Sequence, residues 1–275
     1  MIGRRFLLCF AFFAVASAVS LPDSQHLPRP LILEYPTEKW FDEEQEVVSR
    51  CTTWRFAVEA NNLNPWRTIP AECAEYVRDY MTGRGYSLDL ELVAAEAGAF
   101  ARTVESKDDG KDVWVFDVDE TLLSNLPYYK ERGYGLELFD KHEFGIWVEK
   151  AMAPAIDSSK KLYEQVQYLG FKVFLLTGRS ESHRGVTEVN LLEAGFRNWD
   201  KLILRGADDH GKPATEYKSE KREELVKEGY RIVGNSGDQW SDLLGSSISN
   251  RSFKLPNPML QQKTFHCGAL IPHPF

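Results

Sequence analysis

Two acidic residues two positions apart, Asp117 and Asp119, directly follow a run of four apolar residues at 113–116. A short apolar run of this kind is typical of a strand buried on both faces, as in a parallel sheet. Open α/β sheets bind their ligands at the carboxyl ends of their strands, so both carboxylates follow the strand at a ligand-binding position. Together with the hydroxyl of Thr121, they suit a metal-assisted phosphoryl transfer.

Polar side chains also follow the later strands that the apolar pattern predicts. Thr177 and Arg179 end the second strand. Lys218 opens the helix after the third strand, and Asp238 and Asp242 follow the fourth. Because the carboxyl ends of parallel strands meet at one edge of a sheet, we expect these side chains to converge with the Asp-x-Asp pair.

The second half of the chain alternates between strands and helices, which predicts an α/β fold with right-handed crossovers and a doubly wound parallel sheet. With 43% hydrophobic residues, the chain can bury the core that such a fold needs. The expected strands are residues 113–118, 172–176, 201–204, 231–233 and 252–255. The expected helices between them are residues 154–168, 180–194 and 217–227.

The part before the first strand predicts a small helical region. Apolar spacing favours helices at residues 42–61, 71–81 and 87–102, with Ser87 as the cap of the third. The predicted division of the chain is a signal peptide at 1–18, an extension and helical region at 19–110, and a core at 111–275. The core contains an aromatic-rich insertion at about 124–153, whose residues from 126 to 152 we expect to be irregular.

The first eighteen residues predict a secretory signal peptide. Arg4 and Arg5 precede an apolar run at 6–15, and an Ala-Ser-Ala triplet ends at Ala18. That run is too short to span a bilayer, and no later stretch is long and apolar enough, so we expect no membrane attachment after signal removal. The predicted location is the secretory pathway, leading to the cell exterior or the vacuole.

Charge and cysteine content fit that route. The chain has 33 Lys and Arg residues, and two of them leave with the signal. The remaining 31 stand against 41 Asp and Glu residues, which gives the mature chain a formal charge of −10. An acidic chain without a basic patch argues against nucleic acid as a partner. Three cysteines remain, and we expect Cys51 to pair with Cys73 in the same helical region, which leaves Cys267 over. Asn250 begins the only N-glycosylation sequon.

The ordered motifs resemble the haloacid dehalogenase superfamily of phosphohydrolases, which carries an Asp-x-Asp pair, a Thr or Ser after the second strand, a Lys and a later acidic pair. Within it, nearly the whole mature chain is similar to the plant acid phosphatase and vegetative storage protein family, which are class B-like acid phosphatases. In that superfamily the cap occupies the place of the insertion. The similar stretches are Asn125-Leu126-Pro127-Tyr128-Tyr129, Ala153-Pro154-Ala155, Leu176-Thr177-Gly178-Arg179, Tyr217-Lys218-Ser219 and Gly237-Asp238-Gln239-Trp240-Ser241-Asp242.

The resemblance implies catalytic roles for four residues. Asp117 would attack phosphorus as the nucleophile and form an aspartyl-phosphate. Asp119 would protonate the leaving oxygen as general acid and then act as base toward water. Thr177 would donate to a phosphoryl oxygen, and Lys218 would balance the charge of the phosphate and Asp117.

The resemblance also implies a bound Mg²⁺. Its ligands would be Asp117, the backbone carbonyl of Asp119, and Asp238, an oxygen-only set that suits this ion. Asp242 belongs to the same metal group and would act mainly by supporting the other ligands. Arg179 either orients the substrate or only pairs with a nearby acid.

Each of these positions has a plainer explanation when taken alone. An Asp-x-Asp pair after an apolar run is commonly a turn, and Thr177 with Gly178 could end a strand in the same way. Lys218 lies on a charged helix face, and Asp238 could be an N-cap. The functional interpretation depends on their joint occurrence, in order, at consecutive strand ends.

The leading interpretation is a secreted or vacuolar Mg²⁺-dependent acid phosphatase that acts on small-molecule phosphate monoesters. The rival is a vegetative storage glycoprotein with little or no activity. The resembled family contains both, and its storage members commonly have Ser at the nucleophile position, where this chain has Asp117. A phosphotransferase or nucleotidase would use the same residues. Whether the chain forms a homodimer stays open.

Overall fold

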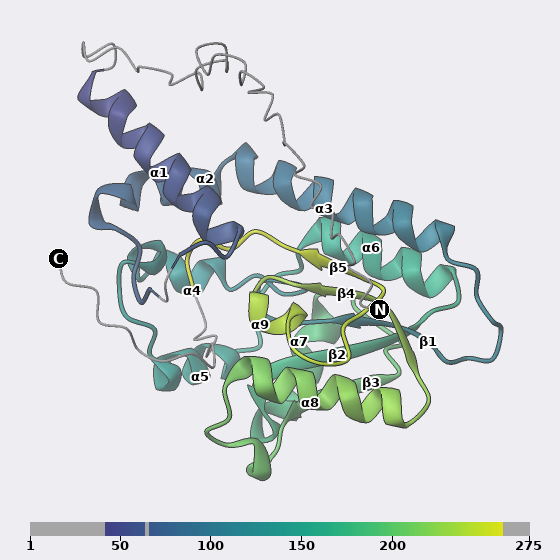
Figure 1. Ribbon diagram of the computed structural model, residues 1–275. Coiled ribbons are helices and arrows are strands. Elements are labelled where there is room, and N and C mark those ends of the chain that lie inside the picture. The colour runs from purple at the N-terminus through teal and green to yellow at the C-terminus, as the bar shows by residue number, and fades with distance from the viewer. Residues whose placement is uncertain (1–41, 64–65, 261–275) are drawn as a thin grey trace, which may run out of the picture. The chain divides into compact units, whose positions relative to one another are not determined.

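A five-stranded parallel sheet forms the centre of the computed structural model, which describes residues 42–63 and 66–260 (Figure 1). The strand order is β3-β2-β1-β4-β5, and every neighbouring pair is parallel. This arrangement confirms the predicted α/β fold. The strands are β1 (Asp112–Phe116), β2 (Lys172–Ser180), β3 (Lys201–Arg205), β4 (Arg231–Gly237) and β5 (Arg251–Lys254).

Helices cover both faces of this sheet and one of its ends. In Figure 1, α3 and α6 lie above the sheet and α8 below it, whereas α1, α2, α4 and α5 gather at one end. The helices are α1 (Glu43–Glu59), α2 (Ala74–Thr82), α3 (Arg84–Thr103), α4 (Leu126–Lys130), α5 (Lys141–Glu149), α6 (Asp157–Tyr168), α7 (Arg184–Glu193), α8 (Ala214–Lys227) and α9 (Trp240–Leu243). Short 3₁₀ turns are η2 (Ala71–Cys73), η3 (Gly133–Gly135), η4 (Glu181–His183) and η5 (Ala207–Asp209).

The central strand β1 is buried on both faces because its side chains alternate between two apolar clusters. Trp114 and Phe116 belong to the cluster that includes buried residues of α3 and α6. Val113 and Val115 belong to the cluster that includes Tyr217 of α8. Full burial on both sides is what the continuous apolar run predicted, and it fixes the end of β1 rigidly in the sheet.

The N-terminal helices and the insertion after β1 share a third apolar cluster. It contains Cys51 and Val77 from the N-terminal helices together with Tyr128 and Tyr129 from α4. A disulfide joins Cys51 to Cys73, with the two Cα atoms 5.4 Å apart, which confirms the predicted pairing. The predicted cap of the third helix is wrong, because α3 begins at Arg84 and Ser87 lies within it.

The insertion is more regular than its sequence suggested. Instead of an irregular segment, the structure has α4 and α5 on either side of the η3 turn. Asp140 caps α5 by accepting from the backbone N–H groups of His142 and Glu143, at 2.8 and 3.1 Å. The ring of Tyr128 packs edge-on against those of Tyr129 and Phe144. Aromatic packing and a capped helix therefore organise the insertion.

Several predicted boundaries shift. Strand β2 runs on to Ser180 and β4 to Gly237, beyond the predicted ends at residues 176 and 233, so the polar residues that follow both apolar runs still form strand. Helix α8 begins at Ala214, which places Lys218 one turn inside it rather than at its opening. The predicted signal peptide, the proline-rich lead-in and Cys267 lie outside the described residues. Among residues 42–63 and 66–260, no helix has the length and apolar character of a membrane span.

Candidate active site

The loop after β1 positions Asp117 and Asp119 at the carboxyl end of the sheet. Asp117 N donates to Ser236 O at 2.9 Å, so its backbone still belongs to the β1–β4 ladder. The chain then turns tightly, because the N–H groups of Leu122 and Leu123 both return to Val118 O at 2.9 Å. The Asp117 carboxylate is therefore carried on a rigid strand end.

Three buried carboxylates meet at this point. Asp117, Asp238 and Asp242 each offer an oxygen, and these atoms all lie within 4.8 Å of one another. Lys218 Nζ reaches the group from α8 and donates to Asp117 Oδ1 at 2.5 Å and to Asp242 Oδ1. With all four groups ionised, three negative charges face one positive charge, which leaves a net charge of −2 away from water.

Burial and crowding shift the pKa values of this group. Burial raises the pKa of Asp117 well above its ordinary value, and the neighbouring carboxylates add to the effect although Lys218 opposes it. Burial and Asp242 raise the pKa of Asp238 to about 6. Burial alone would lower the pKa of Lys218, but the charges of Asp117 and Asp242 outweigh it and raise that pKa. The site therefore resists carrying its full negative charge without a further cation.

Gly237, the last residue of β4, leaves room for the Asp242 side chain to pack against the strand end. A Cβ atom at Gly237 would lie 2.5 Å from Asp242 Cβ, so only glycine fits beside that side chain. Asp242 Oδ2 accepts from Gln239 N at 2.9 Å, and Asp242 O accepts from Asn235 Nδ2 at 2.8 Å. Short local hydrogen bonds therefore bring Asp238 and Asp242, four residues apart, to the same cluster.

The second carboxylate of the Asp-x-Asp pair faces a different partner. Arg179 lies in β2, and its Nε and Nη2 atoms donate to Asp119 Oδ1 at 3.2 and 2.7 Å, while Nε also donates to Oδ2 at 3.1 Å. Burial opposes ionisation of Asp119, but the charge and hydrogen bonds of Arg179 prevail and the pKa of Asp119 is lowered. The side chain of Asp119 remains 22% exposed, whereas that of Arg179 is 2% exposed.

Asn125 connects Asp119 to the insertion. Its Nδ2 donates to Asp119 Oδ1 and to Glu120 Oε2, both at 2.9 Å, and its Oδ1 accepts from Trp147 Nε1 at 2.8 Å. Glu120 has a φ of 53°, in the left-handed region that a residue other than glycine rarely adopts. Asn125 is fully buried and its amide is fully oriented by these partners, so Asp119 is positioned from both β2 and α5.

Thr177 is buried at the end of β2 and is fixed by its neighbours. Its Oγ1 accepts from Arg179 N at 3.1 Å, and its carbonyl accepts from Tyr217 Oη at 3.1 Å. Tyr217 and Lys218 are consecutive on α8, so the same helix turn holds Thr177 and reaches Asp117. Thr121, also buried, contributes a further hydroxyl, with Oγ1 3.5 Å from Asp117 Oδ2.

The donor set fits a hard divalent cation. Carboxylate oxygens are the ligands that Mg²⁺ and similar ions prefer, whereas zinc sites in proteins favour histidine and cysteine. The unbalanced charge of −2 around Asp117, Asp238 and Asp242 would be neutralised by such an ion. The residues present therefore fit a metal site, with Asp117 and Asp238 in reach of the same ion.

The structure brings Asp117, Asp238, Asp242 and Lys218 together, as the topology of a parallel sheet led us to expect. It places Arg179 beside Asp119, and it adds residues to which we assigned no role from the sequence. Asn125 belongs to a motif shared with the resembled family, and that motif could have identified it as a site residue. Asn257, whose Nδ2 donates to Asp238 Oδ2 at 2.7 Å, follows no pattern that sequence reasoning could have used.

Comparison with known proteins identifies the family of the chain. The model of the family "HAD superfamily, subfamily IIIB (Acid phosphatase)" matches residues 37–263. The chain is 62% identical over 255 residues to acid phosphatase 1 of Solanum lycopersicum, covering 93% of this chain and 98% of that one. It is 39% identical over 213 residues to vegetative storage protein 2 of Arabidopsis thaliana, covering 77% and 80%. These matches confirm the predicted family and enzyme class.

The fold also matches a solved structure. The class C acid phosphatase from Bacillus anthracis superposes with a TM-score of 0.56 at 22% identity, covering 68% of this chain and 84% of that one. At this identity the match supports the fold alone.

Proposed function

We propose, because this chain belongs to the acid phosphatases of HAD superfamily subfamily IIIB, that it hydrolyses small phosphate monoesters with the help of Mg²⁺ and through an aspartyl-phosphate on Asp117. One observation carries the proposal: a rigidly held carboxylate, Asp117, shares a buried cluster with one ammonium group and two further carboxylates at the carboxyl end of the sheet. That combination is suited to phosphoryl transfer and has no evident structural purpose.

Asp117 is the proposed nucleophile. One of its oxygens attacks phosphorus, the P–O bond to the leaving group breaks, and an acyl phosphate remains. The attack needs the ionised carboxylate, although burial raises the pKa of Asp117. Lys218, which donates to Asp117 Oδ1, favours the ionised form. A divalent cation, when bound by Asp117 and Asp238, would supply the remaining positive charge and polarise the phosphoryl oxygens.

Asp119 is the proposed general acid and base. It gives its proton to the leaving oxygen, because an alkoxide is a poor leaving group without protonation. Arg179 lowers the pKa of Asp119, so the protonated form that this step needs is favoured at acidic pH. Asp119 then takes a proton from the water that attacks the acyl phosphate, which regenerates Asp117. Arg179 and Asn125 hold Asp119 Oδ1 by hydrogen bonds, so the orientation of the carboxyl is fixed through both steps.

Thr177 and Lys218 complete the proposed site. The Thr177 hydroxyl lies at the end of the strand beside β1 and would donate to a phosphoryl oxygen. Lys218 would keep its positive charge throughout, because its pKa is raised by Asp117 and Asp242. For Arg179, its bidentate contact with Asp119 supports a role in setting that carboxyl rather than in binding substrate directly.

A single assay series tests the proposal. Purified protein should hydrolyse 4-nitrophenyl phosphate, lose turnover in EDTA and regain it with added Mg²⁺. Asp117→Asn, which keeps the side-chain shape and removes the nucleophile, should abolish turnover. Turnover that persists in EDTA, or in Asp117→Asn, would refute the metal-dependent aspartyl-phosphate route. A panel of phosphate esters and alcohol acceptors then separates a general phosphatase from a nucleotidase or phosphotransferase.

The storage-protein alternative is disfavoured by the site itself. An abundant store of amino acids needs no buried charge cluster, and this chain keeps Asp117 where storage relatives of the resembled family commonly carry Ser.

Secretion and glycosylation are part of the proposal. Asn250 is exposed just before β5, as a glycan site requires, and the Cys51–Cys73 disulfide suits an oxidising compartment. Loss of a mass increment on enzymatic deglycosylation would test Asn250.

A further inference from the structure

Two amide side chains hold Asp238, and the proposed chemistry uses neither. Gln239 Nε2 and Asn257 Nδ2 both donate to Asp238 Oδ2, at 2.9 and 2.7 Å. All three side chains are more than nine-tenths buried. The two amides therefore fix the orientation of a carboxylate that would bind the cation.

The amide of Asn257 can point in only one direction. Its Oδ1 accepts from Met259 N at 3.0 Å, so its NH₂ end must face Asp238. Gln239 is anchored in the same segment, because its Nε2 also donates to Leu260 O at 2.9 Å. Both amides therefore depend on where the chain after β5 lies.

That segment is held by Glu59, the last residue of α1. Glu59 Oε1 accepts from Asn257 N at 2.9 Å, and Oε2 accepts from Lys254 Nζ at 2.7 Å. The backbone carbonyl of Glu59 accepts from Trp240 Nε1 at 3.1 Å, two residues after Asp238. The end of α1 thus contacts the chain on both sides of the Asp238 loop.

Helix α1 itself has a limited apolar attachment. Only Cys51 and Val58 are buried along its length. The disulfide to Cys73 and the hydrogen bonds from Arg55 to Tyr76 Oη and Asp89 Oδ2, both at 3.1 Å, supply further links to the next two helices. The position of Glu59 therefore depends partly on a covalent link between two N-terminal elements.

We propose that Glu59 and Asn257 are positioning residues of the metal site, and that the disulfide-linked helix α1 is thereby a working part of it. The inference rests on the proposed function, because it takes Asp238 as a ligand of the cation. Neither residue needs to touch phosphate or metal. Removing a hydrogen-bond partner that orients a metal ligand commonly weakens metal binding about tenfold to hundredfold.

Calorimetric titration of Mg²⁺ into the metal-free, disulfide-intact protein tests the inference. The variants are Asn257→Ala and Glu59→Ala, and the matched control is Glu46→Ala, an exposed residue of α1 that pairs with Arg50. We expect Asn257→Ala to weaken Mg²⁺ binding about tenfold to hundredfold, Glu59→Ala to weaken it by a smaller factor, and Glu46→Ala to leave it unchanged. Saturating Mg²⁺ should restore kcat in both test variants.

Wild-type affinity in Asn257→Ala and Glu59→Ala, or an equal loss in Glu46→Ala, would overturn the inference. If near-ultraviolet circular dichroism shows that Asn257→Ala is not folded, Glu59→Gln decides. That variant keeps the side-chain shape and removes one acceptor. It must weaken Mg²⁺ binding while its near-ultraviolet circular dichroism matches that of Glu46→Ala. A wild-type protein that binds no Mg²⁺ would instead refute the proposed metal site, and this inference with it.

Discussion

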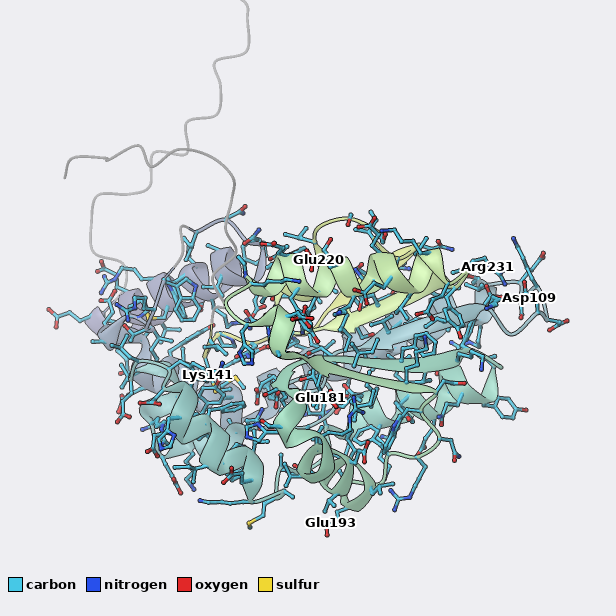
Figure 2. The ribbon with its side chains drawn as sticks, turned by 90° about the horizontal axis from the view of Figure 1, so that it is seen from below. Asp109, Lys141, Glu181, Glu193, Glu220 and Arg231 are labelled. Atoms are coloured by element: carbon cyan, nitrogen blue, oxygen red, sulfur yellow. A yellow bond between two sulfur atoms is a disulfide. The ribbon has the colours of Figure 1, made fainter. Side chains whose placement is uncertain are left out.

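The two ends of the central sheet carry acidic clusters of opposite character. At the amino ends of β1 and β4, Arg231 donates to both oxygens of Asp109 at 2.8 and 2.6 Å and to Asp112 Oδ1 at 2.7 Å. Figure 2 shows Asp109 and Arg231 together, on the side of the molecule away from Lys141 of α5. At the carboxyl ends, the buried carboxylates of Asp117, Asp238 and Asp242 lie together, and Lys218 donates to Asp117 and Asp242.

The carboxyls respond to these surroundings in opposite ways. Hydrogen bonds from Arg231 lower the pKa of Asp109 to about 2 and also lower that of Asp112. Burial raises the pKa of Asp117 and of Asp238. The amino-end charges are therefore balanced within the fold, whereas Asp117, Asp238 and Asp242 carry more negative charge than Lys218 balances. Under the proposed function, the first cluster would stabilise the structure and the second would serve the reaction.

The largest effect is expected from Lys218→Met, which removes the ammonium group that donates to Asp117 and Asp242. These two buried carboxylates would then lose their ion-pair partner, and breaking a buried pair in this way commonly costs about 3–5 kcal/mol of stability. Turnover of 4-nitrophenyl phosphate should fall by roughly a thousandfold or more, since Lys218 contacts the nucleophile. Assays at saturating Mg²⁺, with melting curves, check both effects. Near-wild-type turnover would contradict the assigned role.

Asp119→Asn should separate the general acid from the nucleophile. An alkyl phosphate needs its leaving oxygen protonated when the acyl phosphate forms, so its kcat/KM, which reports that step, should drop about a hundredfold to ten-thousandfold. A nitrophenyl phosphate leaves as a stabilised anion, so its kcat/KM should fall much less. Comparing kcat/KM for the two esters in wild type and variant separates this step from the later one, in which Asp119 acts as base on the same acyl phosphate for both esters. Equal losses of kcat/KM for both esters would mean that Asp119 is not the general acid.

Gly237→Ala tests the close packing that brings Asp242 into the cluster. The new methyl group would displace the Asp242 side chain, because a Cβ atom there lies 2.5 Å from Asp242 Cβ. A displacement of this order should reduce kcat/KM by roughly tenfold to hundredfold. Steady-state kinetics measure this effect, and Gly185→Ala, where a Cβ meets nothing within 4 Å, is the control. A silent Gly237→Ala would show that the position of Asp242 matters little.

The pH dependence of Mg²⁺ binding follows from the raised pKa of Asp238, about 6. A raised carboxyl pKa means that protons compete with the cation as pH falls through that value. Between pH 7 and pH 5 the affinity for Mg²⁺ should therefore decrease about tenfold or more. Titration calorimetry at several pH values tests this sign. Binding that strengthens on acidification would be the opposite result.

Arg231→Met at the amino end should have the smallest effect on catalysis. Its partners Asp109 and Asp112 would lose their guanidinium, and their pKa values would return toward the ordinary range. The stabilisation that these lowered values provide is fully present above about pH 4 and is lost as pH falls toward about 2, so the difference in melting temperature between variant and wild type should shrink across that range. Its kcat should equal that of wild type. A large loss of turnover would remove the contrast between the two ends.

The strands β1 to β4 could be predicted because each contains a short apolar run, whereas β5 has only Phe253 as an apolar residue. The sequence also indicated the converging residues, since parallel strands must end at the same edge. It failed where local pattern does not decide the structure. The insertion lacks helical periodicity, yet Asp140 followed by Glu143 is a helix-start signal that could have located α5.

The supporting residues of the site were beyond sequence reasoning for a different reason. Asn257 reaches Asp238 from a loop after β5, and Glu59 reaches Asn257 from the far end of the chain. These contacts depend on how the N-terminal helices pack against the end of the sheet. No spacing in the sequence encodes that packing, so only the folded structure reveals it.

The most direct test of the central claim is a crystal structure of the protein grown with Mn²⁺, with the ion located by anomalous diffraction. We expect one strong peak at the carboxyl end of the sheet, from an ion bound by Asp117 and Asp238, with Lys218 still beside Asp117. The contradicting result would be crystals in which Mn²⁺ binds elsewhere and no peak lies at the carboxyl-end cluster. The excess negative charge of that cluster would then not serve to hold a divalent cation.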